Sequence, residues 1–374
     1  MAEETDVGGR APRVDSGMAL EPAPQGAVSG ETCYLCASSG QILYSGLTDY
    51  RLGQGSYRIV RCSSSSCRLL WLSPFPPEAD LQRSYRSYYT HADSDHHSWL
   101  RRFHDNILAV HATSRYGYRP HPSPPKRALL RMAAVLYPGG PQEMGRSVMY
   151  LRAPTRSSLL VDVGCGNGEF LFRMMTLGWQ VMGMDTDPSA VLQAQRKGVA
   201  ARVGDLASCK LPDAYADAIT MSHVIEHVSD PFSLLRECLR VLKPGGTLSL
   251  VTPNAASLAA RIFGASWFAL DVPRHLMLFR IATLRSTATA AGFAVETLTS
   301  SVTGARSVWT QSLRLRRRHY LGPMGRSTLA SFAGGLPFQL LERILVASGR
   351  ELGEELILQA RRPGPTDELE GPVN

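Results

Sequence analysis

The sequence feature that most constrains the fold is a strand, turn, helix and strand pattern in the middle of the chain. It opens with an apolar run, Leu159–Val163, which is short enough for a buried strand. A glycine-rich turn follows at Gly164–Gly168, and apolar residues then recur at helical spacing up to Gly178, which can take the positive φ of a helix end. A second strand, Gln180–Met184, ends in Asp185. This order predicts the first half of a nucleotide-binding α/β sheet.

The glycine turn and the acid after the second strand indicate the kind of ligand. Glycines let the backbone approach a ligand closely, and a helix N-terminus presents N–H groups with a partial positive charge. Asp185 can accept hydrogen bonds from both hydroxyls of a ribose, so we expect an adenosine derivative. A dinucleotide site reads GxGxxG, which would place a glycine at Glu169. The third glycine is instead Gly168, and Asp162 precedes the turn, so the pattern is that of a different adenosine ligand.

Further segments continue the alternation of strands and helices. A third strand at Ala201–Val203 leads to Asp205, and a fourth at Ala216–Met221 leads to SHVIEHV at Ser222–Val228. The motif RVLKPGG precedes a fifth strand at Thr247–Thr252. With the glycine turn, these motifs resemble those of the class I S-adenosylmethionine (SAM) methyltransferases over residues 157–300. The resemblance implies a Rossmann-like α/β domain at residues 157–362, with a seven-stranded sheet of order 3-2-1-4-5-7-6 and an antiparallel last strand.

The same resemblance assigns roles to individual residues. The turn glycines surround the methionine part of SAM, and Asp162 supports the turn or the amino group. Asp185 holds the ribose and Asp205 reaches the adenine edge. Ser222 and His223 contact the methionine end through their backbone, at the carboxyl end of the fourth strand. The expected cofactor-binding residues are Asp162, Gly164, Cys165, Gly166, Gly168, Asp185, Thr186, Asp205, Leu206, Ser222 and His223.

The implied reaction is transfer of a methyl group from the sulfonium of SAM. The enzyme must align the acceptor atom with the S–CH3 bond and, for an oxygen or carbon acceptor, remove a proton. Histidine suits proton removal near neutral pH, so His275 is the first catalytic candidate and His227 the second. The alternative for either residue is a structural histidine that caps a helix or a loop.

The expected acceptor is a small molecule: a sugar, a glycolipid or a natural-product intermediate. The segment WFALDVPRHLMLF, residues 267–279, is similar to a subgroup of bacterial class I methyltransferases that act in surface-glycan, lipid and natural-product pathways. One alternative is an RNA methyltransferase, but nucleic acid is not the favoured partner because the N-terminal module has few basic residues. Another is a non-enzymatic scaffold, which is disfavoured because the glycines, Asp185 and Asp205 are all present.

A second signal lies in residues 31–90, which contain four of the seven cysteines. Two pairs, CxxC and Cx4C, are separated by 25 residues that include short strand patterns at Gln41–Tyr44 and Tyr57–Val60. Cysteine pairs on a small β module predict a structural, tetrahedral zinc site, with reduced and unliganded thiols as the alternative. The module and the tyrosine-rich segment after it resemble the sugar C-methyltransferases of deoxysugar synthesis. The expected ligands are Cys33, Cys36, Cys62 and Cys67.

The remaining segments connect or extend these two modules. Residues 1–30 have few large apolar groups and are expected to be a disordered tail, and residues 363–374 form a second tail. Residues 91–156 are expected to be a helical linker. The insertion at residues 305–348 could cap the substrate pocket, lie against a lipid surface, or pack as core or as a dimer contact.

Composition limits the expected cellular location and the expected binding partners. No uninterrupted apolar run reaches the roughly 18 residues of a membrane span, and no signal peptide is recognisable, so we expect a cytoplasmic protein. The formal charge of +8 comes mainly from arginine. The densest run, Arg314–Arg318, is more often one solvated helix face than a nucleic-acid or membrane patch.

Overall fold

A seven-stranded sheet lies at the centre of the protein, for which a computed structural model describes residues 32–77, 144–155, 157–318 and 334–364, with residues 81, 112 and 115–118. The strand order is β10-β11-β8-β7-β4-β5-β6. The strands from β4 to β8 are parallel, while β11 is antiparallel to β8 and β10. This is the predicted order with its antiparallel last strand, so the predicted fold is confirmed. The strands are β4 (Leu159–Val163), β5 (Gln180–Asp185), β6 (Ala201–Val203), β7 (Ala216–Ser222), β8 (Leu242–Pro253), β10 (Ala294–Ser301) and β11 (Glu355–Arg361).

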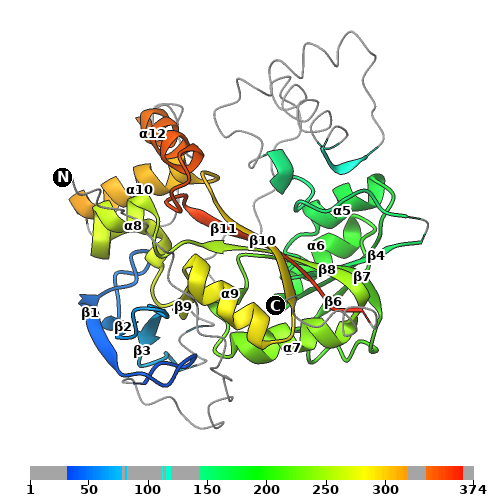
Figure 1. Ribbon diagram of the computed structural model, residues 1–374, viewed down its shortest axis with the longest axis horizontal. Coiled ribbons are helices and arrows are strands. Elements are labelled where there is room, and N and C mark those ends of the chain that lie inside the picture. Colours follow the sequence, from blue (N-terminus) through cyan, green and yellow to red (C-terminus); the bar gives the residue numbers. More distant parts are fainter. Residues whose placement is uncertain are drawn as a thin grey trace, which may run out of the picture.

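Helices cover the two faces of this sheet, with α5 and α6 on one side and α7 and α9 on the other (Figure 1). Two of them begin at an Asp-Pro pair. Asp187 accepts a hydrogen bond from the N–H of Ser189 at the start of α6, and Asp230 accepts one from the N–H of Ser233 at the start of α7. These caps satisfy N–H groups that a helix start leaves without a partner. The helices are α5 (Glu169–Thr176), α6 (Pro188–Arg196), α7 (Pro231–Val241), α8 (Leu258–Phe263) and α9 (Ile281–Ala290).

The N-terminal module, residues 32–77, forms a second sheet that we call the knuckle sheet. Its order is β1-β2-β3-β9, and its fourth strand comes from the chain between β8 and β10 of the large sheet. Leu70 and Trp71 of β3 pair with Leu278 and Met277 of β9. All four side chains are buried in the hydrophobic core that also contains the central strands of the large sheet. The module therefore shares its core with the large sheet. The strands are β1 (Gly40–Leu47), β2 (Tyr57–Cys62), β3 (Leu70–Ser73) and β9 (Met277–Leu278).

The insertion contains α10 (Ala305–Arg318) and α12 (Leu336–Ala347); α10 packs both on α12 and on α8. Trp309 of α10 stacks on Phe338 of α12 with the ring centroids 4.3 Å apart. The same indole meets the ring of Phe263 on α8 edge to face, at 4.9 Å. Among the possibilities left by the sequence, these contacts favour packing as part of the protein core.

Four of the expected segments fall mostly or wholly outside the described residues: the two tails, the tyrosine-rich segment and most of the linker. The described end of the linker lies on the large sheet, where Met149 packs against Val251 and Ile357. In the part of the chain that the structure describes, no helix has the length and apolar character needed to cross a membrane.

Candidate active site

The glycine turn between β4 and α5 forms the base of the candidate site. Gly164, Gly166 and Gly168 all have positive φ, at 74°, 54° and 74°. A Cβ on Gly164 would lie 2.5 Å from a methyl group of Val224, and one on Gly168 would lie 2.6 Å from the Cβ of Ala194. A Cβ on Gly166 would meet no atom within 4 Å. The outer two glycines are thus required by close packing, whereas the middle one faces open space where a ligand could approach the backbone.

Asp185, at the carboxyl end of β5, holds this turn in place. Its Oδ2 accepts a hydrogen bond of 2.8 Å from the N–H of Gly166, and its Oδ1 accepts one of 2.9 Å from the N–H of Asp187. Each carboxylate oxygen has a further lone pair, so the side chain keeps acceptor capacity for ribose hydroxyls. The acid and the turn that the sequence assigned to one ligand are therefore in direct contact.

Asp162 lies beneath the turn, on β4, and is 5% exposed. Its Oδ1 accepts a hydrogen bond of 2.6 Å from the hydroxyl of Thr220 on the adjacent strand β7. Burial, together with the nearby charge of Asp185, raises the pKa of Asp162 to about 7, against the opposing effect of the Thr220 hydrogen bond. A positively charged ligand above this carboxyl would favour its ionised form.

The other expected cofactor residues differ in exposure. Asp205 is exposed, and its Oδ1 accepts a hydrogen bond of 2.7 Å from the N–H of Ser208. Hydrogen bonding by the side chain of Ser208, and then by this N–H, lowers the pKa of the Asp205 carboxyl. Thr186 is also exposed, at the end of β5. Leu206 is 0% exposed and Cys165 is 7% exposed, so both side chains contribute to the core. For these two, only backbone atoms remain as ligand contacts.

The loop after β7 lies beside the glycine turn and carries a charged network that the sequence did not predict. His223 has a positive φ of 56°. Its Nδ1 lies 3.0 Å from Oε1 of Glu226, and its Nε2 lies 3.2 Å from Oε1 of Glu355 on β11. Arg146 donates to the other oxygen of Glu355 and, at 3.1 Å, to the hydroxyl of Ser222. Burial lowers the pKa of His223, but the two carboxylates outweigh it and raise the pKa to about 9.

The two histidines named as catalytic candidates are brought together. The ring centroids of His227 and His275 are 4.7 Å apart, with an edge-on angle of 71°. Nδ1 of His227 donates to the carbonyl of Arg274 at 3.0 Å, and Nδ1 of His275 donates to the carbonyl of Ala269 at 2.7 Å. In this tautomer Nε2 is the acceptor nitrogen of each ring. Both histidines can therefore accept a proton through Nε2.

Glu226 completes this cluster from the same loop as His227. Three possible ligand atoms lie within 4.8 Å of one another, one each from Glu226, His227 and His275. This arrangement could also hold a metal ion. Burial and the charge of His275 lower the pKa of His227 to about 4, so His227 is neutral near pH 7. Oε2 of Glu226 accepts a hydrogen bond of 2.9 Å from the hydroxyl of Thr252, at the end of β8.

A buried ion pair connects the knuckle to the residue before His275. The guanidinium of Arg274 is 0% exposed and donates to both oxygens of Asp49, at 2.9 and 3.2 Å. It also donates to Oδ1 of Asp271, at 2.8 and 2.6 Å, and lies 5.5 Å from the ring centroid of Tyr50. Asp49 lies between β1 and β2, so a knuckle residue fixes the peptide whose carbonyl orients His227.

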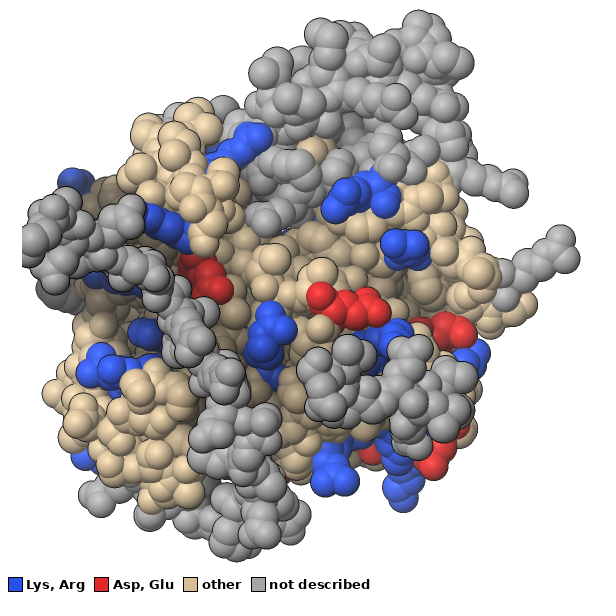
Figure 2. Space-filling model, viewed as in Figure 1, with Lys and Arg blue, Asp and Glu red and all other residues tan. Residues whose placement is uncertain are grey.

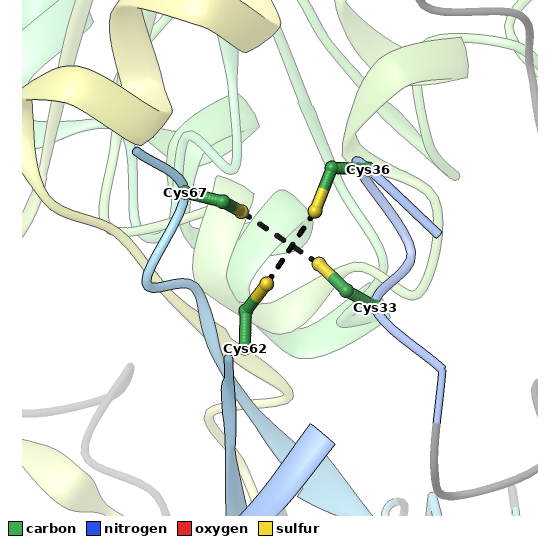
Figure 3. Close-up of side chains that lie close together, drawn as sticks. All are labelled: Cys33, Cys36, Cys62 and Cys67. Carbon is green, nitrogen blue, oxygen red and sulfur yellow. Dashed lines mark hydrogen bonds between the residues drawn. The ribbon is translucent and has the colours of Figure 1, made fainter. Parts of the chain in front are cut away.

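The four knuckle cysteines converge on one point, as Figure 3 shows. The Sγ atoms of Cys33 and Cys67 are 3.7 Å apart, and those of Cys36 and Cys62 are 3.4 Å apart. All four Sγ atoms lie within 4.8 Å of one another. A tetrahedral zinc ion with Zn–S distances of about 2.3 Å requires sulfur separations of about 3.8 Å. The donor set therefore fits zinc.

Comparisons with known proteins find similarity to methyltransferases. Residues 118–298 match the family described as methyltransferase domain. A ubiquinone biosynthesis O-methyltransferase of Xanthomonas oryzae is 38% identical over 124 residues, covering 31% of this chain and 52% of that protein. The corresponding enzyme of Cereibacter sphaeroides is 34% identical over 129 residues, covering 32% of this chain and 52% of that protein. This chain thus spans about half the length of these relatives. A SAM-dependent methyltransferase from Mesorhizobium loti has 20% identity, a TM-score of 0.38, and coverage of 56% of this chain and 93% of that one.

Proposed function

Because the chain carries a class I SAM-dependent methyltransferase domain, we propose that it transfers the methyl group of SAM to an oxygen or carbon atom of a small-molecule acceptor. The observation that carries this proposal is the pairing of Gly166 with Asp185. The backbone of Gly166 faces open space, and its N–H is held by the carboxylate expected to bind the ribose. A ligand at the turn would therefore meet both groups at once.

In this proposal the glycine turn and Asp185 hold SAM, whose sulfonium makes the methyl group electrophilic. Asp162 lies below the turn and becomes ionised when a positive charge is bound above it. Asp205 marks the adenine end, where its backbone and its carboxylate are exposed. The remaining expected residues, Thr186, Ser222 and the backbones of Cys165, Leu206 and His223, complete the boundary of the cofactor site.

The proton of the acceptor is proposed to pass to the histidine pair. Nε2 of His275 is the first acceptor, since Nδ1 is occupied by the carbonyl of Ala269. His227, neutral at pH 7, stands next to it. A neutral imidazole can take a proton from a hydroxyl or an acidic carbon during methyl transfer. The acceptor class of a sugar, glycolipid or natural-product intermediate is part of the same proposal.

The cysteine cluster is proposed to bind a structural zinc ion through Cys33, Cys36, Cys62 and Cys67. The support is the convergence of four thiols at separations that suit tetrahedral coordination. All four donors come from the protein, so no position remains for a catalytic water, and the ion would stabilise the knuckle.

Calorimetric titration of SAM into the purified full chain tests the proposal. We expect 1:1 binding in the wild type and loss of at least about tenfold in affinity for Asp185→Ala, because two acceptor oxygens for the ribose are removed together with the brace of the turn. Asp213→Ala is the matched control, since Asp213 is an exposed aspartate that pairs with Arg240. Absence of SAM binding in the wild type, or equal affinity in Asp185→Ala, would contradict the proposal.

A further inference from the structure

A cavity lined by arginines lies where the knuckle meets α8 and α9. Its volume is about 410 Å³, and it is bounded by the loop that carries Cys67, by Asn254 after β8, and by the segment before β11. Figure 2 shows Lys and Arg side chains at several places on the left of the molecule, where the knuckle lies below α8. Among the lining residues, four arginines face one carboxylate, that of Glu351. We call this site the arginine pocket; its arginines are Arg68, Arg261, Arg280 and Arg350.

Among the described residues that line this pocket, positive charge exceeds negative charge, with four arginines and the one carboxylate of Glu351. Nε of Arg280 is buried, and no described residue accepts a hydrogen bond from it. Burial, and then the charges of Arg261, Arg68 and Arg61, lower the pKa of Arg280. Uncompensated positive charges this close repel one another. A bound anion would therefore reduce the repulsion between the arginines of this pocket.

The start of α9 adds backbone donors to the same cavity. Arg280 is the N-cap of this ten-residue helix, and no side chain caps it. The next two residues, Ile281 and Ala282, also line the pocket. The N–H groups of a first helical turn lack partners within the helix and carry a partial positive charge, which suits a phosphate. Guanidinium groups bind phosphate oxygens in a bidentate manner, so both kinds of donor favour the same ligand.

The pocket is joined to the candidate catalytic groups by two short pieces of backbone. Arg280 follows His275 by five residues through β9, a distance of at most about 17 Å for an extended chain. Asn254 lines the pocket and follows Thr252, whose hydroxyl bonds Glu226. The separation between the arginines and His275 is therefore within the length of one small molecule.

We propose that the arginine pocket binds a phosphate or diphosphate group of the methyl acceptor. The inference rests on the proposed methyl transfer for the identity of the acceptor, and it narrows the substrate to phosphorylated small molecules. A cavity of this size surrounds one or two phosphate groups on several sides. A nucleic-acid backbone would instead require a groove with basic residues along its length.

Binding of inorganic pyrophosphate to the full chain tests this proposal without an identified acceptor. We expect calorimetry to detect pyrophosphate binding that weakens about tenfold or more in Arg261→Gln and in Arg280→Gln, since each variant removes a charge-assisted contact. Arg261 is exposed, so its replacement leaves the core intact if Arg280→Gln folds poorly. The matched control is Arg285→Gln, an exposed arginine on α9 outside the pocket, which should bind pyrophosphate as the wild type does.

A vesicle experiment, compared with pyrophosphate binding, identifies the source of the phosphate. Co-sedimentation with vesicles of phosphatidylcholine and phosphatidic acid that requires Arg280 would assign a lipid-borne phosphate, whereas pyrophosphate binding alone assigns a soluble acceptor. The proposal is overturned if pyrophosphate does not bind, if Arg285→Gln weakens binding as much as Arg280→Gln, or if only a single-stranded RNA oligonucleotide competes for these arginines. SAM affinity, measured on the same variants, should not change. Loss of SAM binding in the wild type would refute the methyl-transfer proposal separately.

Discussion

Replacement of Asp49 by asparagine should destabilise the protein, because Asp49 compensates the buried charge of Arg274, a residue far from it in the sequence. Asp49 is 2% exposed, and its partner Arg274 is 0% exposed. The bidentate contact measures 2.9 and 3.2 Å, and Asp271 supplies the only other carboxylate hydrogen-bonded to the guanidinium among the described residues. Asparagine keeps the volume and one acceptor oxygen but removes the negative charge. The variant therefore leaves a buried cation with half of its compensating charge.

The size of the effect follows from these contacts. Removing one partner of a buried ion pair costs about 3–5 kcal/mol when the remaining charge has no other partner. Because Arg274 keeps Asp271 and one oxygen at position 49, we expect a loss of about 2–3 kcal/mol in the free energy of unfolding. For a chain of 374 residues, whose unfolding entropy is about 0.8 kcal/mol per kelvin, that corresponds to a fall in Tm of about 3–4 °C.

Scanning calorimetry of the full chain measures this change, with Asp213→Asn as the matched control. Asp213 pairs with Arg240 at the surface, where the side chains are 78% and 36% exposed. An exposed pair contributes only about 0–1 kcal/mol, so the control should move Tm by about 1 °C at most. A Tm shift for Asp49→Asn no larger than that of Asp213→Asn would refute the assignment of Asp49 and Arg274 as a connection between the two sheets.

Three other predictions concern the cofactor site and the metal. His275→Ala should keep SAM affinity while turnover falls sharply, because Nε2 is proposed to accept a proton; unchanged S-adenosylhomocysteine release would exclude this role. Treatment with a chelator should remove zinc, detected by atomic absorption, and lower Tm; a Tm that is unchanged after chelation would contradict a structural metal. Folding raises the pKa of Asp162 from its ordinary value of 3.8 to about 7, so its contribution to stability is present below about pH 4 and is lost as pH rises toward 7. Urea unfolding should show that Asp162→Asn gains stability over the wild type between about pH 4 and pH 7. If the free energies of unfolding of the two proteins keep a constant difference over this pH range, the raised pKa of Asp162 is contradicted.

The large sheet could be predicted from the sequence because its signals are local. Leu159–Val163 is apolar except for Asp162, as is typical of strands buried on both faces, and the positive φ of Gly164 and Gly168 needs glycine. Asp185 follows its strand directly, so its position at the sheet edge followed from the strand end. The cysteine pairs at Cys33–Cys36 and Cys62–Cys67 are a similar local signal, although their spacing did not indicate what the knuckle packs against.

The contacts that complete the site could not be predicted in this way. β9 is only two residues long, too short for any period of apolar residues to reveal it. Arg146 and Glu355 are 209 positions apart, and nothing in either sequence neighbourhood indicates an ion pair. The only available signal for Glu226 was its position between His223 and His227 in SHVIEHV, after the fourth strand. Such residues are brought together by the fold, and their pairing becomes visible only when the strand order is known.

The shared sheet explains why changes in the knuckle should act on the acceptor side of the site rather than on the SAM side. Leu276 donates its N–H to the carbonyl of Glu226 and accepts a hydrogen bond from the N–H of Leu72 on β3. One residue thus connects the knuckle to the loop that carries the glutamate and to the segment that carries His275. The glycine turn and Asp185 are held separately, by β4, β5 and their own hydrogen bonds. Metal loss should therefore disturb the histidine pair before it affects SAM affinity, and the two readouts can be measured on the same chelated sample.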